Sequence, residues 1–372
     1  MAGIYIHIPF CKSRCIYCGF YSTTGLELRQ RYVEAVCREI ETHPFPLSEG
    51  MGIDTIYLGG GTPSQLTIPQ LRQIFDALYK YNNVSADAEI TVEMNPDDVT
   101  EVFADGLCLL PVNRISMGAQ TFNDERLKWL HRRHTSHQVA EALGRLRDNG
   151  IRNISIDLMY GFPGEKLEDW EADINTALAL NVEHLSAYCL SIEEGTPLRQ
   201  WIIDNGQLIM DEELERQMYY MLIDKLEAAG YEHYEISNFA RPGYRSRHNS
   251  SYWNGTPYIG LGAAAHSYDG HTRSWNIADI HQYIEGMERG ERLFESEVIE
   301  GDTLYNDRLT IALRTREGLN LSLLSDEHRT YCTKNARRFI DDGLLKIIDN
   351  HLSLTRKGLF ISDMIISELM LV

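Results

Sequence analysis

Three cysteines near the N-terminus are the residues of this sequence best suited to chemistry. Their spacing is Cys11-x3-Cys15-x2-Cys18. Structural zinc usually takes four ligands, commonly in two separated pairs, and no second pair accompanies this triad. The spacing therefore predicts a [4Fe-4S] cluster held by three thiolates, with one iron left without a protein ligand. The alternatives are a zinc knuckle or three incidental buried thiols.

The open iron of such a cluster has a specific use. It can chelate the amino and carboxylate groups of a methionine, and an electron from the cluster can then cleave the adjacent sulfonium to give a 5′-deoxyadenosyl radical. The triad thus predicts that S-adenosylmethionine binds here. Four further cysteines are scattered among apolar neighbours, which is typical of buried small side chains. They are Cys37, Cys108, Cys189 and Cys332.

The elements that must position this triad alternate between strand and helix patterns. Between the strand segments, apolar residues recur with helical spacing, as at Val139, Leu143 and Leu146, with Gly150 placed to end that helix. The alternation predicts a parallel α/β sheet, and six units are too few for a closed eight-stranded barrel. We therefore expect a partial (β/α)6 barrel. The expected strands are Ile4–Ile8, Thr55–Leu58, Glu89–Glu93, Arg114–Gly118, Ser155–Leu158 and His184–Leu190.

Residues with chemical potential cluster at the carboxyl ends of these strands, where barrels of this kind build their sites. The triad follows the first strand, and the glycine-rich run 59–63 follows the second. Glu93 ends the third strand, Gln120 follows the fourth, and Asp157 lies near the end of the fifth. We expect all of them to meet on one rim.

The second half of the chain has a different pattern. An amphipathic helix is expected at 211–229, followed by short strands and loops over 231–273. From Asp302 onward we expect helices and a short hairpin with its turn at Asn350-His351, a pattern that resembles a winged-helix module. The expected domains are a barrel at 1–195, a barrel extension at 196–300 and a C-terminal winged-helix-like domain at 301–372.

Composition excludes some classes of protein. The chain has 372 residues and a net charge of −19, which argues against general nucleic-acid binding because phosphate contacts need clustered lysine and arginine. No apolar run approaches the roughly 18–20 residues of a transmembrane segment. The N-terminus lacks the features of a signal peptide. We therefore expect a cytoplasmic protein.

Several segments together resemble one family. The stretch IYIHIPFCKSRCIYCGF is similar to the radical SAM signature of oxygen-independent coproporphyrinogen III oxidases and of the related HemW-type heme chaperones. The similarity covers nearly the whole chain, with its motifs in order. They continue with GGGTPS at 59–64, VEMNPDD at 92–98, NRISMGAQTF at 113–122, IDLMYGFPG at 156–164 and HNSSYW at 248–253.

The resemblance implies roles in binding S-adenosylmethionine. Tyr5 and Tyr17 would contact it near the cluster loop. Its methionine end would lie against Gly60, Gly61 and Thr62, where missing side chains let backbone groups approach. A carboxylate at Glu93 could bind a ribose hydroxyl or the ammonium group. The family also implies contacts, some to a second molecule, from Gln120, Arg132 and Asp157.

The resemblance further implies a heme site. The sequence His248-Asn249-x2-Tyr252-Trp253 resembles the HNxxYW motif linked to heme binding in HemW proteins. Imidazole is a good axial ligand for heme iron, and aromatic rings stack on porphyrins. The alternative is a hydrogen-bonded, buried histidine beside a packed Tyr-Trp pair. His266 and His271 lie nearby and could serve instead.

Two functions fit this framework. One is a heme chaperone, with heme, an electron donor and a heme-acceptor protein as partners. The other is an oxidase that decarboxylates two propionates of coproporphyrinogen III. The resembling oxidases carry a further cysteine where this chain has Phe20, and an extension where it has only ten residues before Cys11, so we expect the chaperone. A radical SAM enzyme with an unrelated substrate is a third hypothesis.

Overall fold

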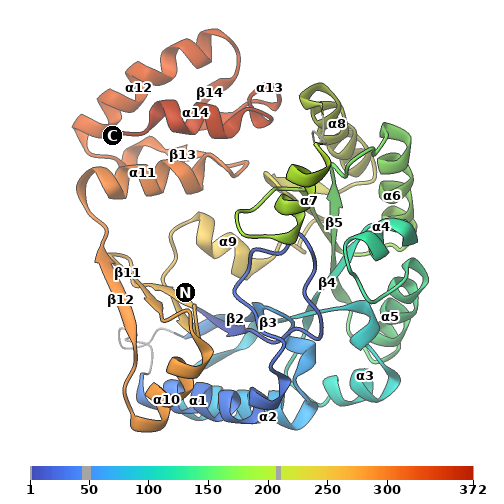
Figure 1. The fold of residues 1–372 in the computed structure, drawn as a ribbon. Coiled ribbons are helices and arrows are strands. Elements are labelled where there is room, and N and C mark those ends of the chain that lie inside the picture. The colour runs from blue at the N-terminus through green and yellow to red at the C-terminus, as the bar shows by residue number, and fades with distance from the viewer. Residues whose placement is uncertain (1, 44–51, 207–210, 372) are drawn as a thin grey trace.

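A twelve-stranded sheet forms the centre of the molecule (Figure 1). The computed structural model describes residues 2–43, 52–206 and 211–371. Six neighbouring parallel strands make up the middle of the sheet, in chain order and at the predicted positions, so the partial barrel is confirmed. These strands are β1 (Gly3–Ile8), β2 (Ile53–Gly60), β3 (Val84–Met94), β4 (Arg114–Gln120), β5 (Asn153–Tyr160) and β6 (His184–Cys189).

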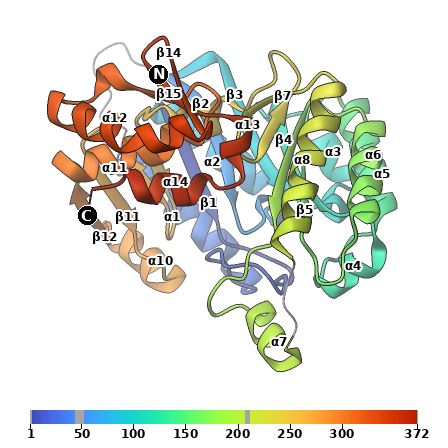
Figure 2. The same cartoon turned by 90° about the horizontal axis from the view of Figure 1, so that it is seen from above.

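Helices cover the outer face of these strands (Figures 1 and 2). Except for the short α4 (Asp124–Trp129), each contributes buried apolar side chains to the core against the sheet, as Val139, Leu143 and Leu146 do on α5. Helix α2 begins at a capping box formed by Thr67 and Gln70, which satisfies backbone N–H groups at its first turn. The helices are α1 (Arg29–Thr42), α2 (Ile68–Tyr81), α3 (Glu101–Leu107), α4 (Asp124–Trp129), α5 (Ser136–Asp148) and α6 (Leu167–Ala179).

The segment after β6 extends the sheet at both edges. Helices α7 (Pro197–Asn205) and α8 (Glu212–Ala228) precede β7 (Glu232–Glu235) and β8 (Asn238–Ala240), which pair antiparallel beside β6. At the other edge β9 pairs parallel with β1 and leads into three antiparallel strands. The elements here are α9 (Arg247–Trp253), β9 (Tyr258–Leu261), β10 (His266–Tyr268), β11 (Thr272–Asn276), α10 (Ile280–Arg289) and β12 (Phe294–Val298).

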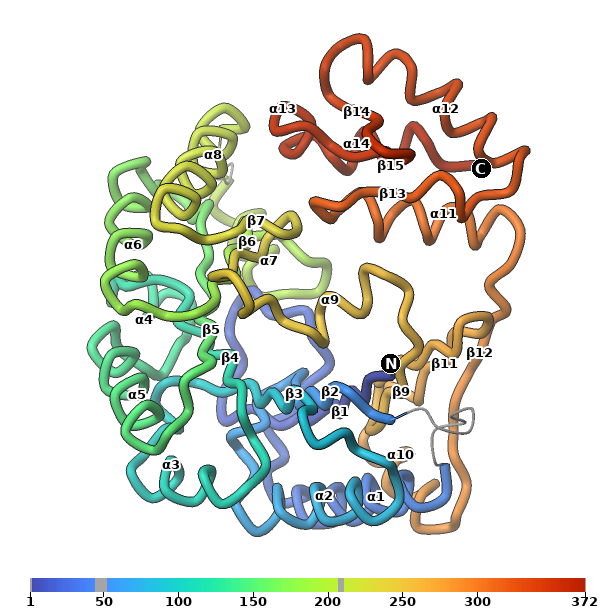
Figure 3. The backbone as a smooth tube through the Cα atoms, turned by 180° about the vertical axis from the view of Figure 1, so that it is seen from behind, coloured from blue at the N-terminus to red at the C-terminus, as the bar shows by residue number. Residues whose placement is uncertain are grey.

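The C-terminal segment forms a module with its own buried core, drawn from residues between 305 and 369. Helix α9 lies between this module and β2 (Figure 3). Three short strands in the order β13-β15-β14 accompany the helices, as expected for a winged-helix-like module. The elements are α11 (Gly301–Ala312), β13 (Leu319–Asn320), α12 (Asp326–Asp341), β14 (Leu345–Ile348), β15 (His351–Leu354), α13 (Arg356–Leu359) and α14 (Ser362–Leu369).

The hairpin turn of this module lies one residue earlier than the sequence predicts. Asp349 and Asn350 form it with φ of 48° and 62°, and His351 is already the first residue of β15. Positive φ at both turn positions matches the twist of a two-residue hairpin, and Asn and Asp tolerate it better than His. Within the described ranges, no helix is long and apolar enough to cross a membrane.

Candidate cluster and ligand site

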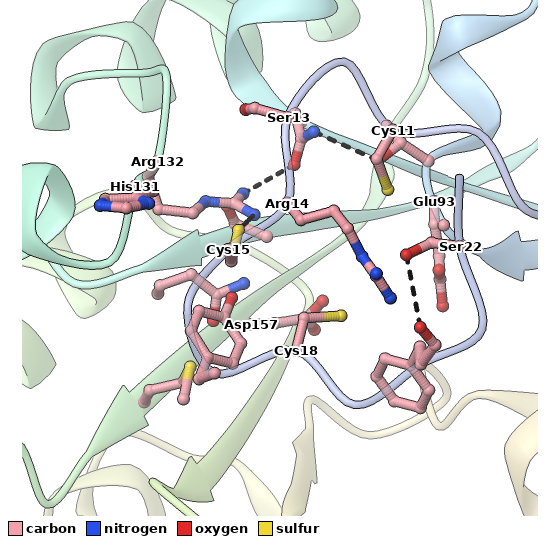
Figure 4. A pocket seen from close by; sticks show the side chains of 18 of the residues that line it. Cys11, Ser13, Arg14, Cys15, Cys18, Ser22, Glu93, His131, Arg132 and Asp157 are labelled. Carbon is pink, nitrogen blue, oxygen red and sulfur yellow. Dashed lines mark hydrogen bonds between the residues drawn. The ribbon is translucent and has the colours of Figure 1, made fainter. Parts of the chain in front are cut away.

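A cavity of about 680 Å³ opens at the carboxyl ends of the six parallel strands, where the sequence predicted a common rim. Its walls include the three cysteines, and Figure 4 shows them around the same space as Glu93, Arg132 and Asp157. Eleven of the thirteen predicted site residues line this cavity. They are Cys11, Cys15, Cys18, Tyr17, Gly60, Gly61, Thr62, Glu93, Gln120, Arg132 and Asp157.

The loop that carries the cysteines is held in place by contacts of Ile16. Ile16 is buried in a small apolar cluster with Leu130 and Leu198, apart from the main core. Its backbone N–H donates to the carbonyl of Leu130 at 3.3 Å, and its carbonyl accepts from the N–H of Leu198 at 2.9 Å. Leu198 belongs to α7, which projects beside the loop in Figure 2. Ile16 therefore fixes the backbone between two of the cysteines.

All three cysteine thiols are free and partly buried. The Sγ of Cys11 lies 3.6 Å from the Oγ1 of Thr62, and the Nη1 of Arg132 donates to the Sγ of Cys15 at 3.6 Å. Burial raises the pKa of the Cys11 and Cys18 thiols above the ordinary value. Since iron binds the thiolate, cluster binding must supply the free energy of this deprotonation.

The donor set fits an iron–sulfur cluster. Three sulfur ligands on one short loop face a cavity that has room for a ligand beside them. No group of three or more His, Cys, Asp or Glu side chains in the described part of the chain surrounds one point closely enough to hold a single metal ion. A cubane binds its protein ligands at separate corners, so its cysteines stand farther apart than those of a mononuclear site.

The glycine-rich run forms a cradle where side chains are excluded. A Cβ at Gly61 would lie 2.7 Å from the carbonyl carbon of Pro9 and 2.8 Å from the carbonyl oxygen of Ile8. Gly60 has φ of +105°, and a Cβ there would lie 2.4 Å from the ring of His7. The backbone of this run therefore packs tightly against the end of β1, and only glycine permits this approach.

Glu93 stands at the wall of the cavity. Its Oε1 accepts a hydrogen bond from the hydroxyl of Tyr57 at 2.6 Å, and its Oε2 accepts from the N–H of Gly60 at 3.2 Å. Burial, more than any other cause, raises the pKa of Glu93 to about 7, and nearby Asp157 adds to the rise. A cationic ligand in the cavity would favour the ionised carboxylate.

Gln120 and Arg132 lie together over β4. Gln120 has φ of +68° at an irregularity in the β4–β5 register, and Gly118 leaves room for both side chains. The Nη2 of Arg132 donates to Gly118 O at 2.6 Å and to Asn95 Oδ1 at 2.7 Å. Its Nε–H is buried and has no partner among the described residues.

Two polar residues of this rim were not singled out from the sequence. Asn95 holds Arg132 and donates to the Oγ1 of Thr62 at 3.4 Å. Ser116 donates to both oxygens of Asp157 at 3.3 Å, and burial raises the pKa of that carboxyl. Asn95 follows Glu93 by two residues in the VEMNPDD motif, so its place beyond a strand end was the available signal.

Tyr5 and His248 lie outside this cavity. Tyr5 lines a second, neighbouring pocket. His248 is fully buried, with Nδ1 bonded to the Oγ1 of Thr55 at 2.8 Å and Nε2 to the hydroxyl of Tyr252 at 2.9 Å. Burial lowers its pKa to about 3. In this conformation neither ring nitrogen is free to coordinate iron.

Comparison with known proteins agrees with this geometry. The model of the radical SAM superfamily matches residues 5–177, and that of the HemN C-terminal domain matches residues 299–361. Among curated proteins, the heme chaperone HemW of Bacillus subtilis is 35% identical, with 88% of this chain and 87% of that protein covered. The heme chaperone HemW of Mycobacterium tuberculosis is 32% identical, with 99% and 94% covered.

A solved structure matches over almost the whole chain. It is the Escherichia coli coproporphyrinogen III oxidase HemN, a radical SAM enzyme, with a TM-score of 0.85 and 25% identity. The match covers 99% of this chain and 89% of HemN. The chain therefore belongs to the radical SAM superfamily and, within it, to the HemW family. A radical SAM fold implies a [4Fe-4S] cluster and S-adenosylmethionine, as the triad predicted.

Proposed function

We propose that this protein is a heme chaperone that carries its cluster and S-adenosylmethionine in the large cavity and heme beside it. The curated HemW relatives, which match most of the chain, support this function. The structural observation that best supports this function is the position of Phe20. Its side chain is 69% exposed and lines both the cluster cavity and a second, aromatic pocket. A tetrapyrrole in that pocket would lie directly beside the cluster loop.

The residue assignments for S-adenosylmethionine are part of this proposal. Gly60, Gly61 and Thr62 leave space for its methionine end next to the cluster, and Glu93 offers a carboxylate to its positive charge. Arg132 lines the same cavity and offers its positive charge to an anionic group of the ligand. When bound, the cluster and S-adenosylmethionine supply one-electron chemistry. The chain's own contribution is to hold both within one cavity.

A decarboxylating oxidase is the second candidate, because the HemN structure matches the chain from end to end. The chain has Phe20 where the resembling oxidases carry a cysteine after the triad. Within the same cavity, the glycine cradle and Glu93 would serve either function. The two functions therefore differ in what the protein does to the tetrapyrrole.

An anaerobic assay separates the two candidates. The reconstituted, reduced protein is incubated with S-adenosylmethionine and coproporphyrinogen III, and protoporphyrinogen formation is followed. In parallel, the protein is loaded with heme and mixed with an apo-heme protein, and heme transfer is followed by absorbance. We expect transfer without decarboxylation. Turnover of coproporphyrinogen III at enzyme-like rates, in a sample with an intact cluster, would refute the chaperone function.

A further inference from the structure

A second pocket, of about 300 Å³, lies beside the cluster cavity between β1, β9, β10 and the end of the cluster loop. Seven of its eight lining residues carry aromatic or imidazole rings, so it suits a flat aromatic ligand. The volume suits one part of a large macrocycle and leaves the rest at the surface, as a carrier that must release its ligand requires. The lining residues are Tyr5, His7, Phe20, Tyr21, Tyr252, Tyr258, Ala264 and His266.

One histidine of this pocket has ring nitrogens that make no hydrogen bond to the described residues. His266 is exposed at the start of β10, and its ring stacks on Trp275 with 5.8 Å between centroids and 26° between planes. Its ring makes no hydrogen bond to any described residue. His7 differs, because its Nδ1 bonds the hydroxyl of Tyr5 at 3.1 Å and its Nε2 bonds the carbonyl of Tyr21 at 2.9 Å.

We propose that heme binds in this second pocket, packed among its aromatic side chains, with a ring nitrogen of His266 coordinating the iron. This inference rests on the proposed function and names the site where it is carried out. Trp275 holds the imidazole plane, so little side-chain entropy is lost when the iron binds.

The protonation state of His266 suits this role. Partial burial, and then the positive charge of Arg273, lower the pKa of His266 below its ordinary value. The imidazole is therefore neutral near pH 7, which is the form that binds a metal.

The histidine of the HNxxYW motif then acts on the pocket indirectly, through a residue of the pocket wall. His248 is buried, and its Nε2 bonds the hydroxyl of Tyr252, whose ring forms a pocket wall. The ring of Tyr252 in turn packs edge-on against Tyr258, with 4.6 Å between centroids. His248 is thus a positioning residue for two tyrosines of the pocket wall, Tyr252 directly and Tyr258 through Tyr252. This explains how a motif linked to heme can contain a histidine that is inaccessible to iron.

The test is heme titration of the reconstituted, full-length protein, read as a difference spectrum against the same protein without heme. Wild type, His266→Ala, His248→Ala and the control His271→Ala are compared. His271 lies at the exposed β10–β11 turn and lines neither pocket. We expect His266→Ala to shift the Soret band and weaken heme binding at least about tenfold. Added imidazole should restore the band. His248→Ala should weaken binding but keep the wild-type band, and His271→Ala should change neither.

Metal-free protoporphyrin IX separates ligation from stacking. It has no iron for His266 to coordinate, so its affinity should be the same for wild type and His266→Ala. Equal losses of heme and protoporphyrin IX in His266→Ala would overturn iron ligation. A wild-type heme spectrum in His266→Ala would also overturn iron ligation by His266. Loss of the spectral signature of an axial histidine in His248→Ala but not in His266→Ala would do the same. A wild-type protein that binds no heme would overturn both this inference and the chaperone function, whereas the other outcomes leave the chaperone function standing.

Discussion

We predict that Glu93 makes the affinity for S-adenosylmethionine depend on pH, and the size of the effect follows from the surroundings of Glu93. Burial holds the pKa of Glu93 at about 7 without ligand, so below that pH the carboxyl is mostly protonated. The cationic ligand needs the ionised form and lowers this pKa on binding. Binding therefore releases a proton below pH 7, so affinity rises with pH up to about 7 and levels off above it.

The magnitude comes from the fraction of protein that is ready to bind. With a pKa of about 7, roughly one molecule in eleven has an ionised Glu93 at pH 6, and about nine in ten do at pH 8. The dissociation constant for S-adenosylmethionine should therefore be about tenfold higher at pH 6 than at pH 8, or ~1.4 kcal/mol. Anaerobic calorimetry of the reconstituted protein across this range measures it directly.

The matched control is Glu93→Gln, which keeps the shape and can still accept the hydrogen bond from Tyr57 but cannot ionise. Its affinity should be weaker at pH 8 and should lack the tenfold dependence. The amino group of S-adenosylmethionine also titrates, and its contribution is common to both proteins, so the difference between the two slopes isolates Glu93. Equal slopes for wild type and Glu93→Gln would refute the reasoning.

Three further changes test the cluster loop and its cradle. Replacing the whole cysteine triad with alanine should abolish the cluster, because all its thiolate ligands are lost. Iron and sulfide analysis after anaerobic reconstitution measures this. Four irons per chain in the triple variant would contradict the prediction. Ile16→Ala should lower the free energy of unfolding by about 2–4 kcal/mol and speed cluster loss, measured by denaturant titration and by decay of cluster absorbance. The exposed Lys12→Ala is its control, and equal behaviour of the two would argue against the anchor. Gly61→Ala should weaken S-adenosylmethionine binding about tenfold, because its Cβ displaces the backbone of β1. Gly144→Ala, where a Cβ meets nothing within 4 Å, should bind as wild type does, and a normal affinity in Gly61→Ala would exclude the cradle.

The part of the site that follows the β/α alternation could be predicted from sequence. Residues at the ends of parallel strands meet on one edge whatever the details of packing, which is why Glu93, Gln120 and Asp157 were placed correctly. The anchor at Ile16 depends on residues far away in the chain, at Leu130 and Leu198. Nothing in the local pattern of the loop reveals those contacts.

The second pocket could not be predicted, because it depends on a pairing between distant segments. Strand β9 joins the sheet beside β1, more than 250 residues from it in sequence, and brings Tyr258 next to Tyr5. The sequence of the HNxxYW motif also does not determine which face of its short helix is buried against the sheet. Only the packing of α9 on β2 determines that His248 is buried while Tyr252 reaches the pocket.

Because Phe20 lines both the cluster cavity and the second pocket, cluster binding and ligand binding in the second pocket are linked equilibria. Phe20 and Tyr21 follow Cys18 after a single glycine, so a change in loop conformation on cluster assembly would also move a wall of the second pocket. Thermodynamic reciprocity then applies: the factor by which the cluster changes affinity for a ligand in that pocket is the factor by which the ligand changes retention of the cluster. Oxidative loss of the cluster would therefore, through these two rings, also change the affinity of the second pocket for its ligand.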